Sequence, residues 1–297
     1  MTLSTALFVP AVPEVREVSL AEHVEAAAAI VIKQFTPWRL LEAKGVSWEP
    51  ALVLDAPALV TPSALQRLVP RCKDMGEVVY GVGGGRAADA AKFVAHALGL
   101  PWVCVPSALS CLAFFTAHVE LWTLNGWERY EAAPATLVLL DWSLISAAPP
   151  LYRAAGIVDV LSLITACASW QRNPHAQPAY DASLADLARA VAMLGAQHAR
   201  LAHAGEVSAL RALAMALALT AQLERWAGHT HMRIGKEHVL AWQAYQLAEG
   251  ATWRGEPAPP RFTYAQLLAA GILEAALRLD LDAALLREAL GASVSRS

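Results

Sequence analysis

The segment from Val78 to Lys92 constrains the fold of this chain more than any other. It reads VVYGVGGGRAADAAK, an apolar run that enters three glycines, Gly83, Gly84 and Gly85, and continues in alanine-rich sequence typical of a helix. Because glycine lacks a Cβ, backbone amides in such a turn approach an anion closely, and the following helix directs its positive end there. The pattern predicts a strand–turn–helix unit that binds a phosphate group, although a plain strand-to-helix turn reads similarly.

The composition limits the classes of protein to which the chain can belong. Its 297 residues, 56% of them hydrophobic, with a mean hydropathy of +0.38, predict one large or two ordinary domains with extensive cores. A net charge of −3 without a basic run argues against a nucleic-acid partner. A small-molecule partner therefore remains the expectation, and a homo-oligomer is compatible with the sequence.

Several features predict a cytoplasmic protein without a membrane segment. Residues 1–10 lack the basic lead and apolar core of a secretion signal, and no uninterrupted apolar segment reaches the roughly 20 residues needed to span a bilayer. The cysteines form no Cys-x-x-Cys pair, which favours buried thiols in a reducing compartment. They are Cys72, Cys104, Cys111 and Cys167.

The sequence pattern changes near Ala147–Leu151, where two prolines interrupt it. Residues 1–148 are predicted to form an α/β, Rossmann-like domain with a parallel sheet and a β-hairpin, and residues 149–297 an all-α domain. The expected strands are 51–54, 77–82, 102–105, 119–124, 127–130 and 136–140. The expected long helices of the second half are 182–203, 206–227 and 235–249.

The start of the chain is harder to interpret. The pattern predicts one helix, Leu20–Gln34, and no strand elsewhere between Val12 and Pro50. Residues 51–55 are then either the first strand of a dinucleotide-binding unit, with Asp55 facing a ribose, or its second strand in a chain that has lost the first. The short distance from Asp55 to the glycines favours a surface turn residue, which weakens the case for a full dinucleotide.

The order of motifs resembles glycerol-1-phosphate dehydrogenase, within the iron-containing alcohol dehydrogenase and 3-dehydroquinate synthase superfamily. The similar segments run from the glycine block, with Asp89 and Lys92, through Leu100–Ser110 to Gly235–His238, over roughly residues 50 to 275. They also include Asn125–Gly126, an expected hairpin turn, and 137–141, 148–150 and 153–159. The resemblance implies a cleft between the two domains that binds NAD or NADP and a divalent metal such as zinc.

The resemblance also implies roles for individual residues. The cofactor would be bound by Gly83, Gly84, Gly85, Ser107 and Ser110, with Asp89 and Lys92 supporting the loop. Asp159 and His238 match two metal ligands, whose alternative roles are a helix N-terminal carboxylate and a core histidine. Tyr264 stands where the family has its third ligand, a histidine, so the metal site is degenerate, and His238 and Tyr264 become the expected catalytic residues.

Further departures from the family pattern concern the substrate. Leu112 replaces an aspartate that contacts substrate hydroxyls, and Trp242 replaces a second histidine. Cys111 and His118 are candidate replacement groups, as are His229 and His231, although Cys111 reads more readily as a buried, inert thiol.

Three functions remain compatible with the sequence. The leading hypothesis is an NAD(P)-dependent oxidoreductase acting on a hydroxyl or carbonyl of a small substrate, phosphorylated or not. The second is a repurposed enzyme that catalyses elimination, cyclisation or condensation without the usual metal. The third is a pseudoenzyme whose cleft is filled by Trp242, Leu112 and Phe114.

Overall fold

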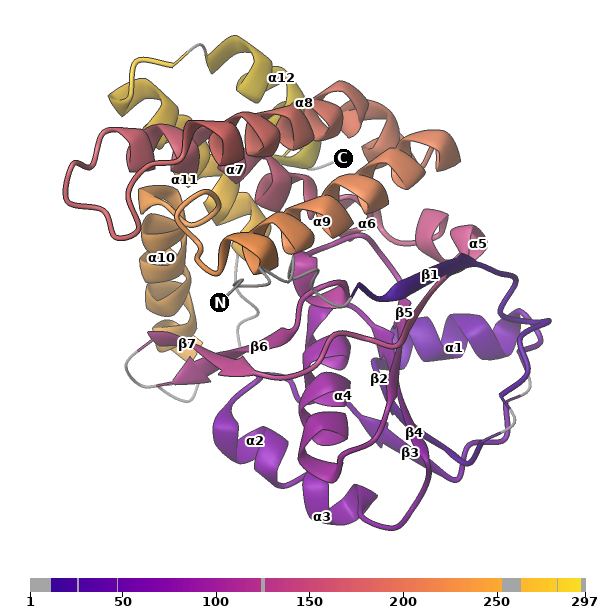
Figure 1. Ribbon diagram of the computed structural model, residues 1–297. Coiled ribbons are helices and arrows are strands. Elements are labelled where there is room, and N and C mark those ends of the chain that lie inside the picture. Colours follow the sequence, from indigo (N-terminus) through magenta and orange to yellow (C-terminus); the bar gives the residue numbers. More distant parts are fainter. Residues whose placement is uncertain are drawn as a thin grey trace, which may run out of the picture.

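A parallel six-stranded sheet organises the first half of the chain (Figure 1). The computed structural model describes residues 12–25, 27–46, 48–123, 126–252, 263–281 and 283–294. In spatial order the strands are β1 (Glu14–Glu17), β8 (Leu137–Leu140), β5 (Trp102–Pro106), β4 (Val78–Gly83), β2 (Ala29–Lys33) and β3 (Leu52–Asp55). All these pairings are parallel, so the carboxyl ends of the strands meet at one edge of the sheet.

Helices cover both faces of this sheet because side chains alternate between the faces along each strand. Ile30 and Val79 belong to the core that includes α2 (Pro62–Gln66), α3 (Val69–Cys72) and α4 (Gly85–Leu98). Val31 and Tyr80 belong to a second core, on the face of α1 (Phe35–Ala43) and α5 (Trp142–Ser146). The two cores account for strands that are apolar on both sides.

A close approach of backbones fixes α4 against β4. A Cβ added to Gly81 would lie 2.9 Å from Ala91 Cβ and 3.0 Å from the Ala87 carbonyl oxygen. Glycine at this position lets the helix pack tightly on the strand, which holds the N-terminus of α4 directly after the strand end.

An antiparallel hairpin and a set of helices complete the chain. The hairpin strands β6 (His118–Thr123) and β7 (Gly126–Glu131) lie beside α4, and a short 3-10 turn (Leu112–Phe114) precedes them. The following helices are α6 (Pro150–Arg153), α7 (Ile157–Gln171), α8 (Ala182–Ala204), α9 (Val207–Ala227), α10 (Lys236–Thr252), α11 (Tyr264–Arg278) and α12 (Ala283–Val294). Helix α7 is almost wholly buried among the others.

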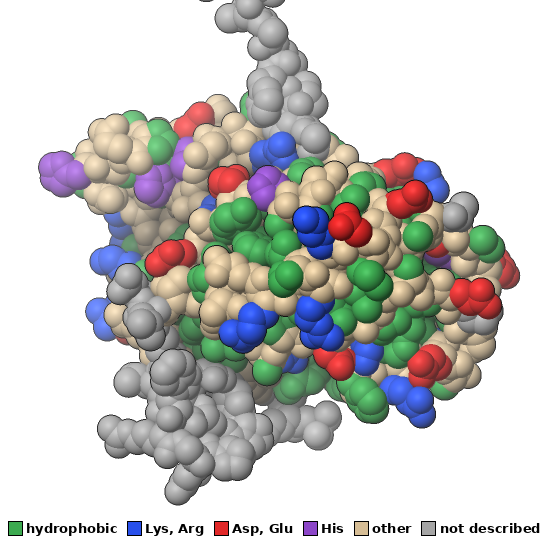
Figure 2. Space-filling model, turned by 90° about the horizontal axis from the view of Figure 1, so that it is seen from below, with side chains coloured by type: hydrophobic (Ala, Val, Ile, Leu, Met, Phe, Trp, Pro, Cys, Tyr) green, Lys and Arg blue, Asp and Glu red, His purple; other side chains and the backbone are tan. Residues whose placement is uncertain are grey.

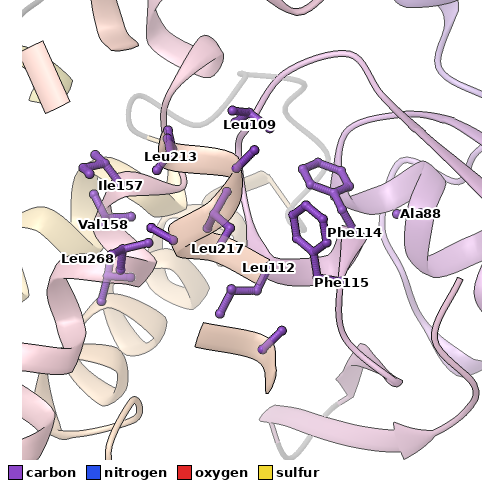
Figure 3. Packing of buried hydrophobic residues seen from close by; sticks show 14 of the residues in the cluster. Ala88, Leu109, Leu112, Phe114, Phe115, Ile157, Val158, Leu213, Leu217 and Leu268 are labelled. Carbon is purple, nitrogen blue, oxygen red and sulfur yellow. The ribbon is translucent and has the colours of Figure 1, made fainter. Parts of the chain in front are cut away.

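One hydrophobic core extends from the sheet into these helices. Figure 3 shows Leu109 and Leu112, from the loop after β5, close to Leu213 and Leu217 of α9. Two backbone hydrogen bonds join the same loop to the helices: the Leu109 amide donates to the Arg153 carbonyl and the Gly156 amide to the Leu109 carbonyl, each at 2.9 Å. The two halves are therefore packed directly on one another.

The predicted α/β fold with a helical second half is confirmed. The strands predicted from residue 51 onward and the three long helices are present, with ends shifted by one to three residues. The last strand, β8, ends at Leu140, and α5 packs on the sheet before α6 begins at Pro150; the domain boundary at 148/149 stays a prediction. Asn125, in the predicted hairpin turn, and residues 1–10 lie outside the described residues.

The prediction for the start of the chain was wrong. Instead of a helix over Leu20–Gln34, the segment contains β2, and β1 precedes it. The alanines before Ile30 suggested a helix, but Ile30, Val31 and Ile32 are β-branched and fully buried on both faces of the sheet. Residues 52–55 form the edge strand beside β2, neither the first strand nor a second strand whose neighbour is lost.

Asp55 lies at the surface, as the sequence predicted. Its carboxylate lies 2.6 Å from Lys33 Nζ and its side chain is 74% exposed. Because β2 is present, the first half of a dinucleotide-binding unit is present as well, and the objection to a full dinucleotide no longer holds.

The surface carries both signs of charge. On the face shown in Figure 2, acidic and basic side chains are interspersed among hydrophobic ones. Among the described residues one helix, α9, is long and apolar enough to cross a membrane, but half of its apolar window is buried inside the protein, as expected for a core helix.

Candidate active site

The glycine turn lies at the carboxyl edge of the sheet, as predicted. Gly83 ends β4 with a φ of +147°, which favours glycine, and Gly84 precedes the first turn of α4. The Gly84 amide donates a hydrogen bond of 2.6 Å to the side-chain oxygen of Gln34, the residue that follows β2. One amide of the predicted phosphate cradle thus already has a partner, the half-buried side chain of Gln34.

A cavity of about 270 Å³ opens beside this turn, which we call the glycine-loop cavity. It lies between the two halves of the chain, as predicted for the cleft. Its lining includes Gly85, Arg86, Asp89, Ser110, Cys111, Leu112, His118, Glu120, Trp127, Asp159, Arg233 and Tyr264.

A second cavity of about 330 Å³ adjoins the first on the side of α10, and we call it the α10 cavity. The two cavities share Glu120, Trp127, Asp159, Arg233 and Tyr264. The α10 cavity is lined in addition by Glu128, Arg129, Ile234, His238, Val239 and Trp242. A ligand that extends from the glycine turn would therefore reach both predicted catalytic residues.

The predicted cofactor residues fall into lining and supporting groups. Gly85, Asp89 and Ser110 line the glycine-loop cavity, and Gly83 and Gly84 form the turn at its edge. Ser107 does not belong to the lining; its amide donates to the Gly83 carbonyl at 3.0 Å, which fixes the end of β5 against the turn.

Lys92 does not line the glycine-loop cavity but forms hydrogen bonds to residues around it. Its fully buried ammonium donates to the carbonyl oxygens of His118 (2.7 Å) and Ala113 (2.9 Å), to Thr116 Oγ1 (3.0 Å) and to Asp89 Oδ1 (3.2 Å). Burial raises the pKa of Asp89 to about 6, although the nearby Lys92 charge opposes this shift. These bonds join α4 to the 3-10 turn and to the start of the hairpin; the predicted support of the glycine turn by this pair stays a prediction.

Asp159, His238 and Tyr264 come together around the α10 cavity. Asp159 lies in the first turn of α7, and burial raises its pKa to about 6 against the charges of Arg233 and His238. His238 Nδ1 lies 3.1 Å from the fully buried Glu237 carboxylate, and its Nε2 is buried with no hydrogen-bond partner among the described residues. Burial raises the pKa of Tyr264 well above its ordinary value.

The sequence interpretation missed a buried ionic cluster at the junction of the two cavities. Arg233 is 3% exposed, and its Nε donates to Glu224 Oε2 at 2.5 Å. The other carboxylate oxygen of Glu224 pairs with Arg129, and Arg233 Nη2 lies 3.5 Å from Glu120 Oε1. The cluster therefore places two guanidinium groups and two carboxylates beside Asp159.

The electrostatics of this cluster are strongly coupled. Burial opposes ionisation of Glu120, but His118 and the charges of Arg233 and Arg129 hold its pKa far below the ordinary value. The pKa of Glu224 is likewise lowered against burial, by Arg233 and Arg129. Both glutamates are therefore ionised, and each forms an ion pair with an arginine.

Part of this cluster had a signal in the sequence. Glu120 and Arg129 are cross-strand partners in the β6–β7 hairpin, and His118 and Glu120 lie two residues apart, on one face. Glu224 and Arg233 lie outside any motif, on α9 and in the connection to α10, so only the fold brings them to the hairpin.

The remaining predicted positions divide between cavity and core. Leu112 and Trp242 line the cavities, and Cys111 lines the first with a pKa raised by burial, as expected for an inert thiol. Phe114 is fully buried in the core (Figure 3). The cavities remain open beside Trp242 and Leu112, which removes the ground for a filled, inactive cleft.

The histidines give a mixed result. His118 lines the glycine-loop cavity. His229 and His231 lie elsewhere, stacked against Trp170 at ring-centroid distances of 5.0 and 5.9 Å. The fold thus separates this pair from the site to which the sequence assigned it.

Comparison with known proteins gives the context of this site. A family model described as "Iron-containing alcohol dehydrogenase" matches residues 24–149. Glycerol-1-phosphate dehydrogenase [NAD(P)+] from Methanosphaerula palustris is 29% identical over 182 residues, 61% of this chain and 50% of that protein. The enzyme of the same name from Thermococcus kodakarensis is 28% identical over 66% of this chain and 56% of its own length.

The structural comparison agrees with the sequence matches. A probable glycerol dehydrogenase from Sinorhizobium meliloti superposes with a TM-score of 0.70 at 19% identity, over 96% of this chain and 83% of that one. This likeness shows the fold, and with the sequence matches it confirms the resemblance drawn from the motifs. The chain spans about half the length of the curated relatives it matches.

Proposed function

This chain belongs to the iron-containing alcohol dehydrogenase superfamily, and on that premise we propose that it is an NAD(P)-dependent oxidoreductase that interconverts a hydroxyl and a carbonyl group on a small substrate. The observation that carries the proposal is the adjacency of the two cavities, which share five lining residues. The glycine turn, which would hold the dinucleotide, lies beside one cavity, and His238, the proposed base, lines the other.

The residues at the glycine turn fit a dinucleotide. Parallel α/β sheets bind such ligands at the carboxyl ends of their strands, where β4 and β2 end here. The first amides of α4, at Gly85 and Arg86, have no intrahelical acceptor and would bind the diphosphate with Ser110. Bound NAD(P)⁺ would accept a hydride from the substrate carbon. For Gly84 to join the anion site, Gln34 must rotate away.

The residues at the other end do not complete a catalytic metal site. Asp159 and His238 are present, but in the described ranges no three His, Cys, Asp or Glu side chains are grouped so that they could hold a metal ion. A catalytic zinc is expected to have three protein ligands, and the neutral phenol of Tyr264 is a poor third one. We therefore derive no step through a metal ion.

Proton transfer can be assigned to His238. In the neutral tautomer that carries its proton on Nδ1, His238 donates a hydrogen bond to Glu237, and Nε2, the buried atom without a partner among the described residues, has a free lone pair. In the oxidation, Nε2 would take the proton of the substrate hydroxyl while the hydride leaves the adjacent carbon. Tyr264, neutral because its pKa is raised, would donate a hydrogen bond to the same oxygen.

Substrate identity is proposed only as a class. The relatives are named for glycerol 1-phosphate, which makes a small polyol or its phosphate the first candidate. Leu112 and Trp242 add apolar surface to the cavities, which favours a less hydroxylated substrate than glycerol.

A second candidate function is a non-redox reaction, such as elimination or condensation, with His238 and Tyr264 as base and acid. The incomplete ligand set around Asp159 favours it. It differs from the first in that turnover would proceed without nicotinamide.

Titration with NADH and NADPH, followed by cofactor fluorescence, tests the leading proposal. A designed variant is Gly84→Ala: its Cβ would lie 3.3 Å from Gln34 Oε1 and 3.5 Å from Ser110 Oγ, so the fold tolerates it while the turn becomes less accessible. Gly291→Ala, where the Cβ meets nothing within 4 Å, is the matched control. We expect binding to the wild type and the control and weaker binding to Gly84→Ala. No binding at millimolar cofactor would refute the proposal.

Activity is then measured as cofactor reduction with glycerol 1-phosphate, glycerol and longer hydroxy compounds. Turnover that depends on NAD⁺ or NADP⁺ supports the redox reaction. Turnover of a substrate without any nicotinamide would favour the second candidate.

A further inference from the structure

Arg233 is held rigidly at the junction of the two cavities. Its guanidinium is anchored by the 2.5 Å hydrogen bond from Nε to Glu224, which is itself buried and paired with Arg129. Ser162 Oγ donates to the Arg233 carbonyl at 3.1 Å, which fixes the backbone of the same residue to α7. Both ends of Arg233 are therefore positioned by the helical half.

The far end of the guanidinium has an unused donor. Nη2 is buried and has no hydrogen-bond partner within the described part of the chain; it forms an ion pair with Glu120 Oε1 at 3.5 Å. A buried donor left without a partner costs stability, so such groups are commonly reserved for a ligand. Arg233 lines both cavities, which places this donor where a ligand would lie.

The guanidinium also lies beside the carboxylate that would bind a divalent ion. Asp159 and Arg233 line the same two cavities, and each shifts the pKa of the other. Arginine does not lose its proton in proteins, so its charge is permanent. Although Glu224 and Glu120 share this guanidinium, it also stabilises the Asp159 carboxylate, which is the role that a bound divalent ion would otherwise have. Both the presence of Arg233 and the incomplete ligand set therefore argue against a resident metal ion.

We propose that Arg233 supplies the fixed positive charge of this active site in place of a metal ion, and that its Nη2 donates a hydrogen bond to the substrate oxygen that becomes negatively charged. This inference rests on the proposed function for the identity of the reaction. The hydroxyl proton goes to His238 Nε2, the hydride leaves the carbon for the nicotinamide, and Arg233 stabilises the charge that develops on the oxygen in between. In the non-redox alternative the same donor stabilises an enolate or alkoxide oxygen.

The first test is metal content, which does not require activity. The full chain, purified without added metal and again after incubation with zinc or iron and desalting, is analysed by mass spectrometry. We expect substoichiometric metal in both samples. One tightly bound divalent ion per chain, lost in Asp159→Asn or His238→Ala, would overturn the inference.

The second test is binding of glycolate, a small hydroxy acid that presents an anionic oxygen, measured by calorimetry in the presence of EDTA. The double variant Arg233→Met with Glu224→Gln removes the guanidinium without leaving a buried, unpaired carboxylate at Glu224. The variant Arg233→Lys keeps the positive charge but lacks the several N–H donors of the planar guanidinium. We expect the double variant to bind glycolate about 10- to 100-fold more weakly than the wild type, with the lysine variant between them.

The matched control is Arg129→Met with Glu224→Gln, which removes the other arginine of the same pair. Its glycolate affinity should stay closer to that of the wild type, because Arg129 is anchored by Glu224 and reaches only the α10 cavity. Equal weakening in the two double variants, unchanged binding without Arg233, or no glycolate binding to the wild type would each overturn the inference. If NADH fails to bind, the proposed function fails, and these two tests still decide the role of Arg233.

Discussion

Replacing Lys92 with methionine is the sharpest test of how the site is supported. The ammonium is fully buried and makes four hydrogen bonds, to Asp89, Thr116 and two backbone carbonyls. Methionine fills similar volume but leaves these acceptors without a donor. Breaking a buried pair by removing one partner costs about 3–5 kcal/mol, and we expect a loss in this range in the free energy of unfolding near pH 8.

The loss should depend on pH in a defined direction. Asp89 already has a raised pKa of about 6 with Lys92 beside it, and removal of Lys92 raises it further. A raised carboxyl pKa gives stability that is present below the unfolded value and is lost as pH rises through the folded value. The variant should therefore be closer to the wild type at about pH 5 than at about pH 8, because Asp89 becomes neutral there.

Urea unfolding followed by tryptophan fluorescence measures both effects. Lys33→Met is the matched control, since Lys33 contacts Asp55, whose side chain is 74% exposed; an exposed pair contributes at most about 1 kcal/mol. A Lys92→Met loss no larger than that of the control, or one that grows toward low pH, would refute the reasoning.

Three further predictions follow from the same geometry. Asp89→Asn should remove about 2–3 kcal/mol of the change in unfolding free energy between about pH 4 and pH 6; an unaltered pH profile in urea unfolding would contradict the raised pKa. Gly81→Ala should destabilise the protein by about 1–3 kcal/mol because its Cβ would meet Ala91 and Ala87, whereas Gly291→Ala, exposed in α12, should leave the stability unchanged or raise it by up to about 1 kcal/mol in the same thermal scan. Gln34→Ala should tighten NADH binding by up to about 10-fold, since it frees the Gly84 amide; weaker binding in the fluorescence titration would show instead that Gln34 contacts the cofactor.

The sequence predicted those parts of the fold whose signals are local. Gly83–Gly85 identified the turn, and the spacing of apolar residues identified α8 and α9. The first strand was missed because Ile30–Ile32 follows alanines, and only its burial between β3 and β4 decides that it is a strand. Helical propensity is a weak guide where tertiary packing opposes it.

The candidate site was predictable only in part. Asp159, His238 and Tyr264 were found through the family order, and the structure brings them to one pair of cavities. Arg233 and Glu224 were not found, because they lie outside any motif, and only the fold brings them beside Glu120 and Arg129 of the hairpin. The sequence around a charged residue does not indicate whether its side chain will be buried in an ion pair.

The two backbone hydrogen bonds between Leu109 and the helices have a consequence for ligand binding. Ser110, Cys111 and Leu112, which directly follow Leu109, line the glycine-loop cavity, so this part of its wall is attached to both halves of the chain. A ligand in that cavity would therefore contact a segment to which the sheet and the helices are both bonded.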